Sequence, residues 1–245
     1  MRKIYFILYT CCLLPFTSMA QDTINTNNLK LNTAAFKTGS RSYAVFFTDS
    51  LGKRISSADI WDRKVNFLEN NKTFEFTWQW WRKDTLMGDV KATGHFPSFK
   101  MISHEANYRN RGQSFYVFNN DVVTVPAIHQ LTAKDSAFKV TLDPAGFEFP
   151  MDLELLPLIP FKKTGQEFLM AFYEPGTPKA DYYKLTVTGK EDVELPAGAK
   201  VNCWMLKIDY APGTYATFWI SDKTREVVKM KEFFRGRYRN KLLLY

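Results

Sequence analysis

The sequence has few of the residues from which disulfide bridges and metal sites are usually built. It contains three cysteines, and two of them, Cys11 and Cys12, lie within the first twenty residues. Without that segment Cys203 remains alone, so no internal disulfide can form and the core must stabilise the fold. Cys203 lies between apolar neighbours, and we expect a buried, unreactive thiol there.

Histidines are also scarce, and none of the three, His95, His104 and His129, has the spacing of a metal site. The HExxH zinc motif is absent, as are the GxSxG nucleophile elbow, phosphate-binding loops and dinucleotide fingerprints. The sequence therefore predicts no catalytic residue, no metal and no cofactor.

Long apolar runs are missing too, apart from a short one at the start. Two basic residues precede an apolar run over residues 4–16, and small residues end at Ala20. These are the three parts of a secretory signal, and the run is shorter than the ~20 residues of a membrane-spanning helix. We expect residues 1–20 to be a signal peptide cleaved after Ala20, and the mature protein to be periplasmic or secreted. The alternative, a lipid-bearing Cys11 or Cys12, would leave a shorter apolar core.

The rest of the chain reads as one β domain. Residues 21–37 are polar and rich in Asn and Thr, so we expect a flexible leader there. From residue 38 to residue 245, short runs of β-branched and aromatic residues alternate with Gly, Pro, Asn and Asp turns. That pattern predicts a single antiparallel β domain over residues 38–245.

Alternation of side chains is clearest in two strands. Between Thr73 and Arg82 aromatic residues occupy alternate positions, and Val201–Tyr210 alternates with both faces partly apolar. Further strands are expected over Ser42–Thr48, Ser98–Tyr108, Ser114–Phe118, Phe138–Leu142, Phe168–Tyr173, Tyr182–Thr188, Thr214–Ser221, Glu226–Phe234 and Arg237–Leu244.

Helix has little room in this sequence. A short helical turn can form between Asp152 and Leu158, but Pro150, Pro157 and Pro160 limit it to one or two turns. The segment is apolar and must lie on another apolar surface. In a curved sheet it would serve as a plug or lid over the open side.

Three stretches near the C-terminus carry a family likeness: Cys203–Leu206 (Cys-Trp-Met-Leu), Thr217–Arg225 (Thr-Phe-Trp-Ile-Ser-Asp-Lys-Thr-Arg) and Val227–Lys229 (Val-Val-Lys). They resemble the DUF3108 family of exported bacterial proteins, and the proline-bounded segment over residues 152–160 is similar to the middle portion of that family. The resemblance implies a strongly curved antiparallel sheet, an incomplete barrel similar to the periplasmic lipoprotein carriers, which hold acyl chains in a concave cavity. It implies no catalytic residue.

The aromatic ladder of the strand Thr73–Arg82 has two interpretations. A half-buried strand presents large aromatic side chains to a core. A curved sheet with more aromatic surface than it can pack would instead use them as the floor of an apolar cavity. The candidate cavity residues are Phe74, Phe76, Trp78, Trp80, Trp204 and Leu206.

A row of basic residues marks the last strand. Arg235, Arg237, Arg239 and Lys241 fall on one face of it. They would form a solvated outer face that discourages edge-to-edge pairing. The alternative is contact with an anionic membrane surface, where each basic residue adds about 1 kcal/mol. Nucleic acid is not expected as a partner of an exported protein.

These observations predict an all-β fold, a strongly curved antiparallel sheet forming an incomplete barrel with a short proline-bounded helical lid. The predicted function is an exported, non-enzymatic binding protein for an apolar or lipid-like ligand, acting as an envelope carrier or chaperone. Two other classes stay open: an enzyme that acts on an envelope glycan or lipid with His104 or His129 as general base, and a protein–protein interaction module of the cell envelope.

Overall fold

The computed structural model describes residues 22–68, 72–195 and 198–244. The expected signal peptide and its cleavage site lie outside these residues. No helix among them is long and apolar enough to cross a membrane.

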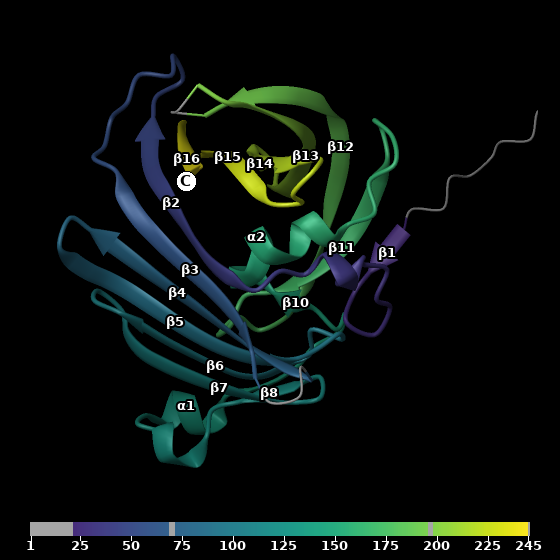
Figure 1. Ribbon diagram of the computed structural model, residues 1–245. Helices are drawn as coiled ribbons and strands as arrows, with labels where there is room; N and C mark the ends of the chain where they lie inside the picture. Colours follow the sequence, from purple (N-terminus) through teal and green to yellow (C-terminus); the bar gives the residue numbers. More distant parts are fainter. Residues whose placement is uncertain (1–21, 69–71, 196–197, 245) are drawn as a thin grey trace, which may run out of the picture.

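One curved sheet contains every described strand (Figure 1). Neighbouring strands are antiparallel, except at one edge, where β1 and β10 run parallel to β11. The strands are β1 (Asp22–Ile24), β2 (Gly39–Thr48), β3 (Asp59–Phe67), β4 (Thr73–Arg82), β5 (Thr85–His95), β6 (Met101–Tyr108), β7 (Gly112–Asn119), β8 (Val122–Thr124), β9 (Lys139–Thr141), β10 (Phe147–Glu148), β11 (Glu167–Tyr173), β12 (Asp181–Glu194), β13 (Lys200–Ala211), β14 (Thr214–Ser221), β15 (Val227–Phe234) and β16 (Arg237–Leu244).

The order of the strands explains the shape. It runs β1-β11-β12-β13-β14-β15-β16-β2-β3-β4-β5-β6-β7-β8-β9, so the last strand of the chain pairs with β2, near the start of the fold. That pairing bends a simple meander around on itself, while the two end strands, β1 and β9, are not paired with each other. The predicted all-β incomplete barrel is confirmed.

Alternation in the sequence located most of the long strands. The bounds of β4, β14 and β16 coincide with the predicted ranges. Two long strands, β3 and β5, were not predicted. β3 turns Asp59 and Arg63 inward between apolar residues, and β5 carries Gly88 and Gly94 at inner positions, so neither shows an uninterrupted row of large apolar residues in its sequence.

Helical segments are short. They are α1 (Ala133–Ala137), α2 (Asp152–Leu155) and the 3-10 turns η1 (Thr33–Ala35), η3 (Ala127–His129), η4 (Phe149–Met151) and η5 (Leu156–Leu158). Figure 1 shows α2 inside the curve of the sheet. The side chains of Leu153, Leu155, Leu156 and Leu158 are at most 3% exposed. We call residues 149–159 the plug, because the expected lid is an internal element packed in the core.

The segment expected to be a flexible leader is part of the fold. Its residues Asp22–Ile24 form β1 on β11, and Ile24 is fully buried. The ring of Phe36 lies 5.5 Å from that of Phe74 and 5.0 Å from that of Phe99. Few but well-placed apolar residues therefore anchor a segment whose average composition is polar.

Cys203 is buried, as expected. It packs with Val193, Trp219 and Val228 in a small cluster contributed by β12 to β15, separate from the main core. Burial raises the pKa of its thiol to about 12, so the thiolate required for nucleophilic chemistry does not form near neutral pH.

Candidate functional site

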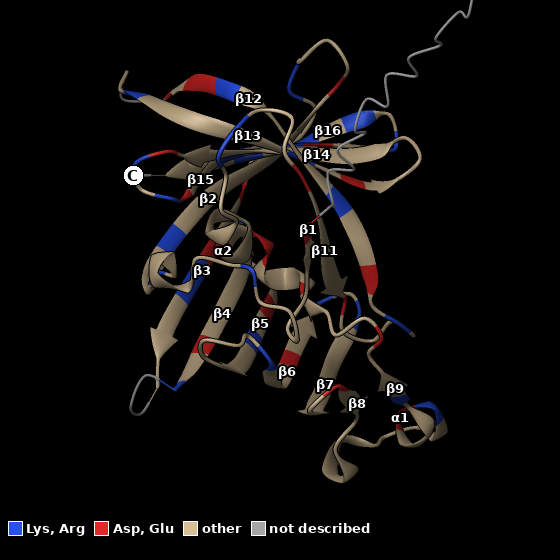
Figure 2. Cartoon of the chain, turned by 90° about the vertical axis from the view of Figure 1, so that its right-hand side faces the viewer, with Lys and Arg blue, Asp and Glu red and all other residues tan. Residues whose placement is uncertain are grey.

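A cavity of about 660 Å³ lies on the inner side of the sheet, against the plug. Its wall carries many aromatic rings, from Phe47, Trp61, Trp78, Trp80, Tyr108, Phe149, Tyr210 and Phe234. It also carries many charges, from Asp59, Arg63, Arg82, Arg111, Asp152, Glu174, Glu232, Arg239 and Lys241. Figure 2, with Lys and Arg in blue and Asp and Glu in red, shows charged positions on the strands around α2. The wall of the cavity is therefore amphiphilic rather than purely apolar.

The aromatic part of the wall is built by neighbouring inner positions of β3, β4 and β6. Trp61 and Trp78 lie with their ring centroids 4.7 Å apart and tilted by 58°, and the ring of Tyr108 lies 6.3 Å from Trp78. The indole N–H groups of Trp61 and Trp78 are buried and have no hydrogen-bond partner among the described residues. Flat apolar surface with spare donors suits a ligand that has both an apolar body and polar atoms.

A buried charge pair joins the sheet to the plug. Arg63 of β3 donates to Glu154 from Nε at 2.9 Å and from Nη2 at 2.5 Å, and its Nη2 also reaches the Pro150 carbonyl at 2.5 Å. Burial works against the charge of Arg63, but the Glu154 carboxylate raises its pKa above the ordinary value. The donors of Arg63 are thus used to hold the plug.

Two further pairs are formed by arginines that are more exposed than Arg63. Arg82 donates to Asp59 from Nε and Nη2, each at 3.0 Å, and the indole N–H of Trp80 donates to the same carboxylate at 2.8 Å. Arg239 donates to Glu232 from Nε at 2.6 Å. Each of these arginines is neutralised by a carboxylate beside it.

Lys241 lines the cavity but makes no such hydrogen-bonded pair with any described residue. Its side chain is 4% exposed, and its Nζ lies 3.8 Å from Asp152 and 4.5 Å from the centroid of the Trp61 ring. Burial lowers the pKa of Lys241 to about 8, against the opposing effect of the Asp152 carboxylate, while Arg239 and Arg63 lower it further. The ammonium is therefore a desolvated charge in contact with the cavity.

The structure divides the predicted aromatic ladder between core and cavity. Phe74 and Phe76 are fully buried in the main core, whereas Trp78 and Trp80 line the cavity. Leu206 is also fully buried core.

Trp204, the remaining candidate, lies away from the cavity. Its indole N–H donates to Asp222 at 2.8 Å, and the Lys190 Nζ lies 4.1 Å from its ring centroid.

The predicted solvated row of basic residues needs correction. Arg239 and Lys241 of β16 point into the cavity, and Arg237, whose guanidinium lies 4.4 Å from the Phe47 ring, is exposed at its edge. Arg235 lies in the turn before β16 with a positive φ of 51°. Alternation correctly put Arg237, Arg239 and Lys241 on one face of β16, but that face is the inner one, and Arg235 does not belong to the strand.

The histidines named as general-base candidates have distinct environments. His104 and Glu148 form a buried pair through Nδ1, a partnership with no local signal in the sequence because the residues are 44 positions apart. Neither is among the described residues that line the cavity. The ring of His129 stacks on the ring of Phe115, with the two ring centroids 3.6 Å apart.

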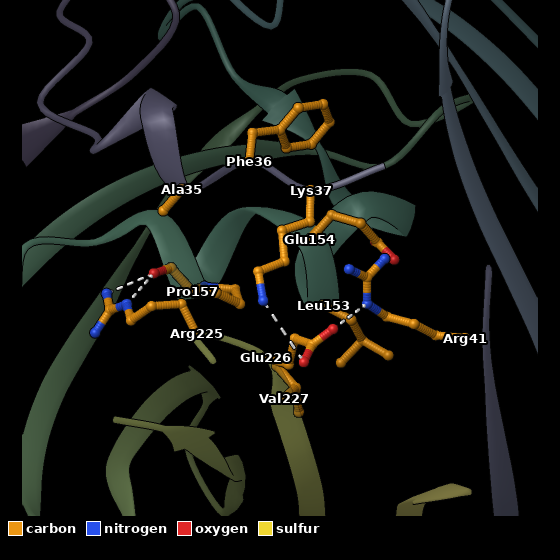
Figure 3. Close-up of a pocket in the computed structure, with 10 residues that line it drawn as sticks. All are labelled: Ala35, Phe36, Lys37, Arg41, Leu153, Glu154, Pro157, Arg225, Glu226 and Val227. Carbon is orange, nitrogen blue, oxygen red and sulfur yellow. Dashed lines mark hydrogen bonds and ion pairs between the residues drawn. The ribbon is translucent and has the colours of Figure 1, made fainter. Parts of the chain in front are cut away.

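A second, smaller pocket marks the other end of the plug (Figure 3). Arg225 donates from Nε to the Pro157 carbonyl at 2.9 Å and from Nη2 to the Ile159 carbonyl at 2.5 Å. Beside it, Glu226 accepts from Arg41 at 3.0 Å. These contacts use the available donors to fasten the plug, and the pocket is too small to be the main binding site.

No group of three or more His, Cys, Asp or Glu residues that could hold a metal ion occurs in the described ranges. Asp59 and Glu232 of the cavity are instead paired with Arg82 and Arg239. Glu174 has no ion-pair partner in the described ranges, and burial raises the pKa of its carboxyl to about 7.

Comparisons with known proteins support the fold. A family model described as "Protein of unknown function (DUF3108)" matches residues 64–242. No curated protein matches the chain. A β-barrel-like protein of the DUF1849 domain of unknown function from Brucella abortus is similar in structure, with 8% identity and a TM-score of 0.52, over 85% of this chain and 96% of that chain.

A second structure, from Bacteroides fragilis and described as a "putative exported protein with YmcC-like fold", has 13% identity and a TM-score of 0.32, over 83% of this chain and 92% of that chain.

Proposed function

Because the chain belongs to DUF3108, a family described only as of unknown function, we propose its function from its geometry: it is an exported, non-enzymatic protein that binds a lipid-like, amphiphilic small molecule. The binding site is the cavity between the curved sheet and the plug. The ligand is carried or stored there out of contact with water.

The observation that carries this proposal is the cavity itself. At about 660 Å³ it falls within the range of roughly 300–1,000 Å³ that small-molecule sites occupy. Core side chains in a protein of this size normally interdigitate with few voids larger than a water molecule. A space of this volume, walled by Trp61, Trp78 and Trp80, is therefore consistent with a site for a ligand with an apolar body.

Paired charges in the wall favour a binding role over a catalytic one. Arg63, Arg82 and Arg239 each hold a carboxylate. Carboxylates paired in this way are poor candidates for a general acid or base. Glu174 differs, because it lines the cavity and burial raises its pKa to about 7, so it keeps the enzyme alternative open. The His104–Glu148 pair has the chemistry of a base and its orienting group but lies outside the described cavity lining.

Export is part of the proposal and is supported by the N-terminal charge and apolar pattern of residues 1–20. An exported carrier without an internal disulfide would depend on its large core for stability outside the cytoplasm. The apolar plug and the sheet supply that core.

The test combines extraction with a cavity-blocking variant. Protein purified from exported material is extracted with organic solvent and the extract is analysed by mass spectrometry. Binding of 11-(dansylamino)undecanoic acid is then measured by energy transfer from tryptophan. Met87→Trp narrows the cavity and should abolish transfer, whereas Leu86→Trp on the same strand adds an equal ring outside the described lining.

An extracted lipid-like molecule and loss of binding only in Met87→Trp are the expected results. No extracted molecule and equal probe binding by both variants would overturn the proposal. Capture of a protein partner in their place would favour the interaction-module alternative.

A further inference from the structure

Lys241 differs from the paired arginines of the cavity in how its donors are used. Arg63, Arg82 and Arg239 each donate hydrogen bonds to a carboxylate. The Nζ of Lys241 lies 3.8 Å from its nearest carboxylate oxygen, beyond hydrogen-bond reach, and it donates no hydrogen bond within residues 22–68, 72–195 and 198–244. An ammonium has three donors and no acceptor, so all three are available to a ligand.

The charges that face Lys241 come from three elements besides its own. They are Asp152 of the plug, Arg63 of β3, Glu232 of β15 and, on β16 itself, Arg239. Asp152 is shared, because its Oδ1 accepts from the Leu153 backbone N–H at 2.7 Å and lies 3.7 Å from Arg63 Nη2. Glu232 is held by Arg239. An acceptor at Lys241 would therefore meet an ammonium whose neighbouring carboxylates already have other partners.

A buried ammonium without hydrogen bonds is costly, since its hydration is lost and little replaces it. Proteins usually place a neutral residue at such a buried position. In the wall of an aromatic cavity, the same ammonium is stabilised when a ligand brings a hydrogen-bond acceptor to it. A charge-assisted hydrogen bond formed there, away from water, is stronger than one on the surface.

We propose that Lys241 binds the anionic group of the ligand, a carboxylate in the simplest case, while the apolar body of the ligand packs on Trp61 and Trp78. The ligand enters with its charged end first. The Trp61 ring beside Nζ fixes this orientation, because a group bound at the ammonium leaves its chain lying along the indoles. This assignment rests on the proposed function and specifies the ligand class, an acidic amphiphile.

The experiment compares an acid with its neutral counterpart. Affinities of wild-type protein for 11-(dansylamino)undecanoic acid and for its methyl ester are measured at pH 7. The acid should bind about tenfold more tightly, as one charge-assisted hydrogen bond predicts. Lys241→Met should remove the difference, and Lys241→Arg should keep most of it. Lys231→Met, which removes an equal charge from the outer side of β15, is the matched control.

The pH dependence gives a second readout that does not need a stable variant. The acid should bind more weakly as the pH rises through about 8, where Lys241 loses its proton, while the ester should be unaffected. Glu174 of the same lining, whose pKa burial raises to about 7, accounts for any weakening that is complete below pH 8. Equal affinity of acid and ester at all pH values would overturn the assignment and leave the proposed function intact. Failure of both probes to bind would instead count against the proposed function itself.

Discussion

The carboxylate of Glu154 accepts two hydrogen bonds from the guanidinium of Arg63, at 2.9 Å from Nε and 2.5 Å from Nη2. Glu154 belongs to the plug and Arg63 to β3, and both side chains are at most 4% exposed. Removing either partner leaves a buried charge without compensation. The geometry therefore makes this pair a buried polar link between the plug and the sheet.

We expect Arg63→Met to lower the free energy of unfolding by about 3–5 kcal/mol, because the Glu154 carboxylate is left buried and unpaired. The double variant Arg63→Met/Glu154→Met should recover much of the loss, since two apolar side chains can replace a buried pair. Urea denaturation measures both.

The control for this pair is Arg82→Met. Arg82 also pairs with a carboxylate, Asp59, but its side chain is 50% exposed, so the expected loss is at most about 1 kcal/mol. Equal losses for Arg63→Met and Arg82→Met would contradict the role given to burial.

The aromatic ladder of β4 should respond differently at its two ends. Phe74→Ala should cost about 3–5 kcal/mol of stability, because the ring is fully buried. Trp78→Ala should cost less, since part of the ring faces the cavity, and should weaken binding of the dansyl fatty acid. A stability loss as large as that of Phe74→Ala with unchanged probe binding would place Trp78 in the core.

We expect the side chain of Arg225 to stabilise the plug, although its backbone conformation is strained. Its φ of 55° favours glycine, and its guanidinium holds the Pro157 and Ile159 carbonyls. We expect Arg225→Gly to lower stability and to speed hydrogen exchange in residues 156–161.

The matched control is Arg235→Gly, at a φ of 51° in the turn before β16. Arg235 holds no carbonyl of the plug, and its guanidinium lies 4.9 Å from the centroid of the Phe234 ring, so relief of backbone strain should leave the variant neutral or about 1 kcal/mol more stable. If Arg225→Gly is as stable as Arg235→Gly, the hydrogen bonds from Arg225 to the plug carbonyls contribute nothing measurable to stability.

The stability of the protein should rise with pH on account of Lys241. Its pKa is about 8 in the folded state and about 10.5 in the unfolded state, so the unfolded chain binds more protons between these values. The cost of the buried charge is fully present below pH 8 and disappears as the pH approaches 10.5. Relative to Lys241→Met, wild-type protein should gain about 2 kcal/mol between pH 7 and pH 9.5. Urea denaturation at both pH values measures the gain, and a constant difference would contradict it.

Cleavage of the N-terminal segment is tested on exported protein. N-terminal sequencing, after enzymatic removal of any pyroglutamate, should begin at Gln21. A lipid-modified Cys11 or Cys12 at the N-terminus would show that the protein is anchored instead.

Sequence alternation was sufficient for the strands whose two faces differ in polarity. The bounds of β4, β14 and β16 follow from it, because a residue period of two puts alternate side chains on opposite faces. The same rule failed for β3, whose inner face mixes Trp61 and Val65 with Asp59 and Arg63. From the sequence alone, a charged residue on the inner face of a strand is interpreted as a surface residue, because its partner is not known.

What the sequence determined by itself is thus the β class, the short proline-bounded helix and the grouping of side chains on each strand. Which face of β16 is the inner one was decided only by its pairing with β2 and β15, which turns Arg239 and Lys241 toward the cavity. The pairings Arg63–Glu154 and His104–Glu148 join residues 91 and 44 positions apart. Local periodicity carries no information on pairings between residues so far apart in the sequence. The curvature of the sheet around the plug brings these charges together.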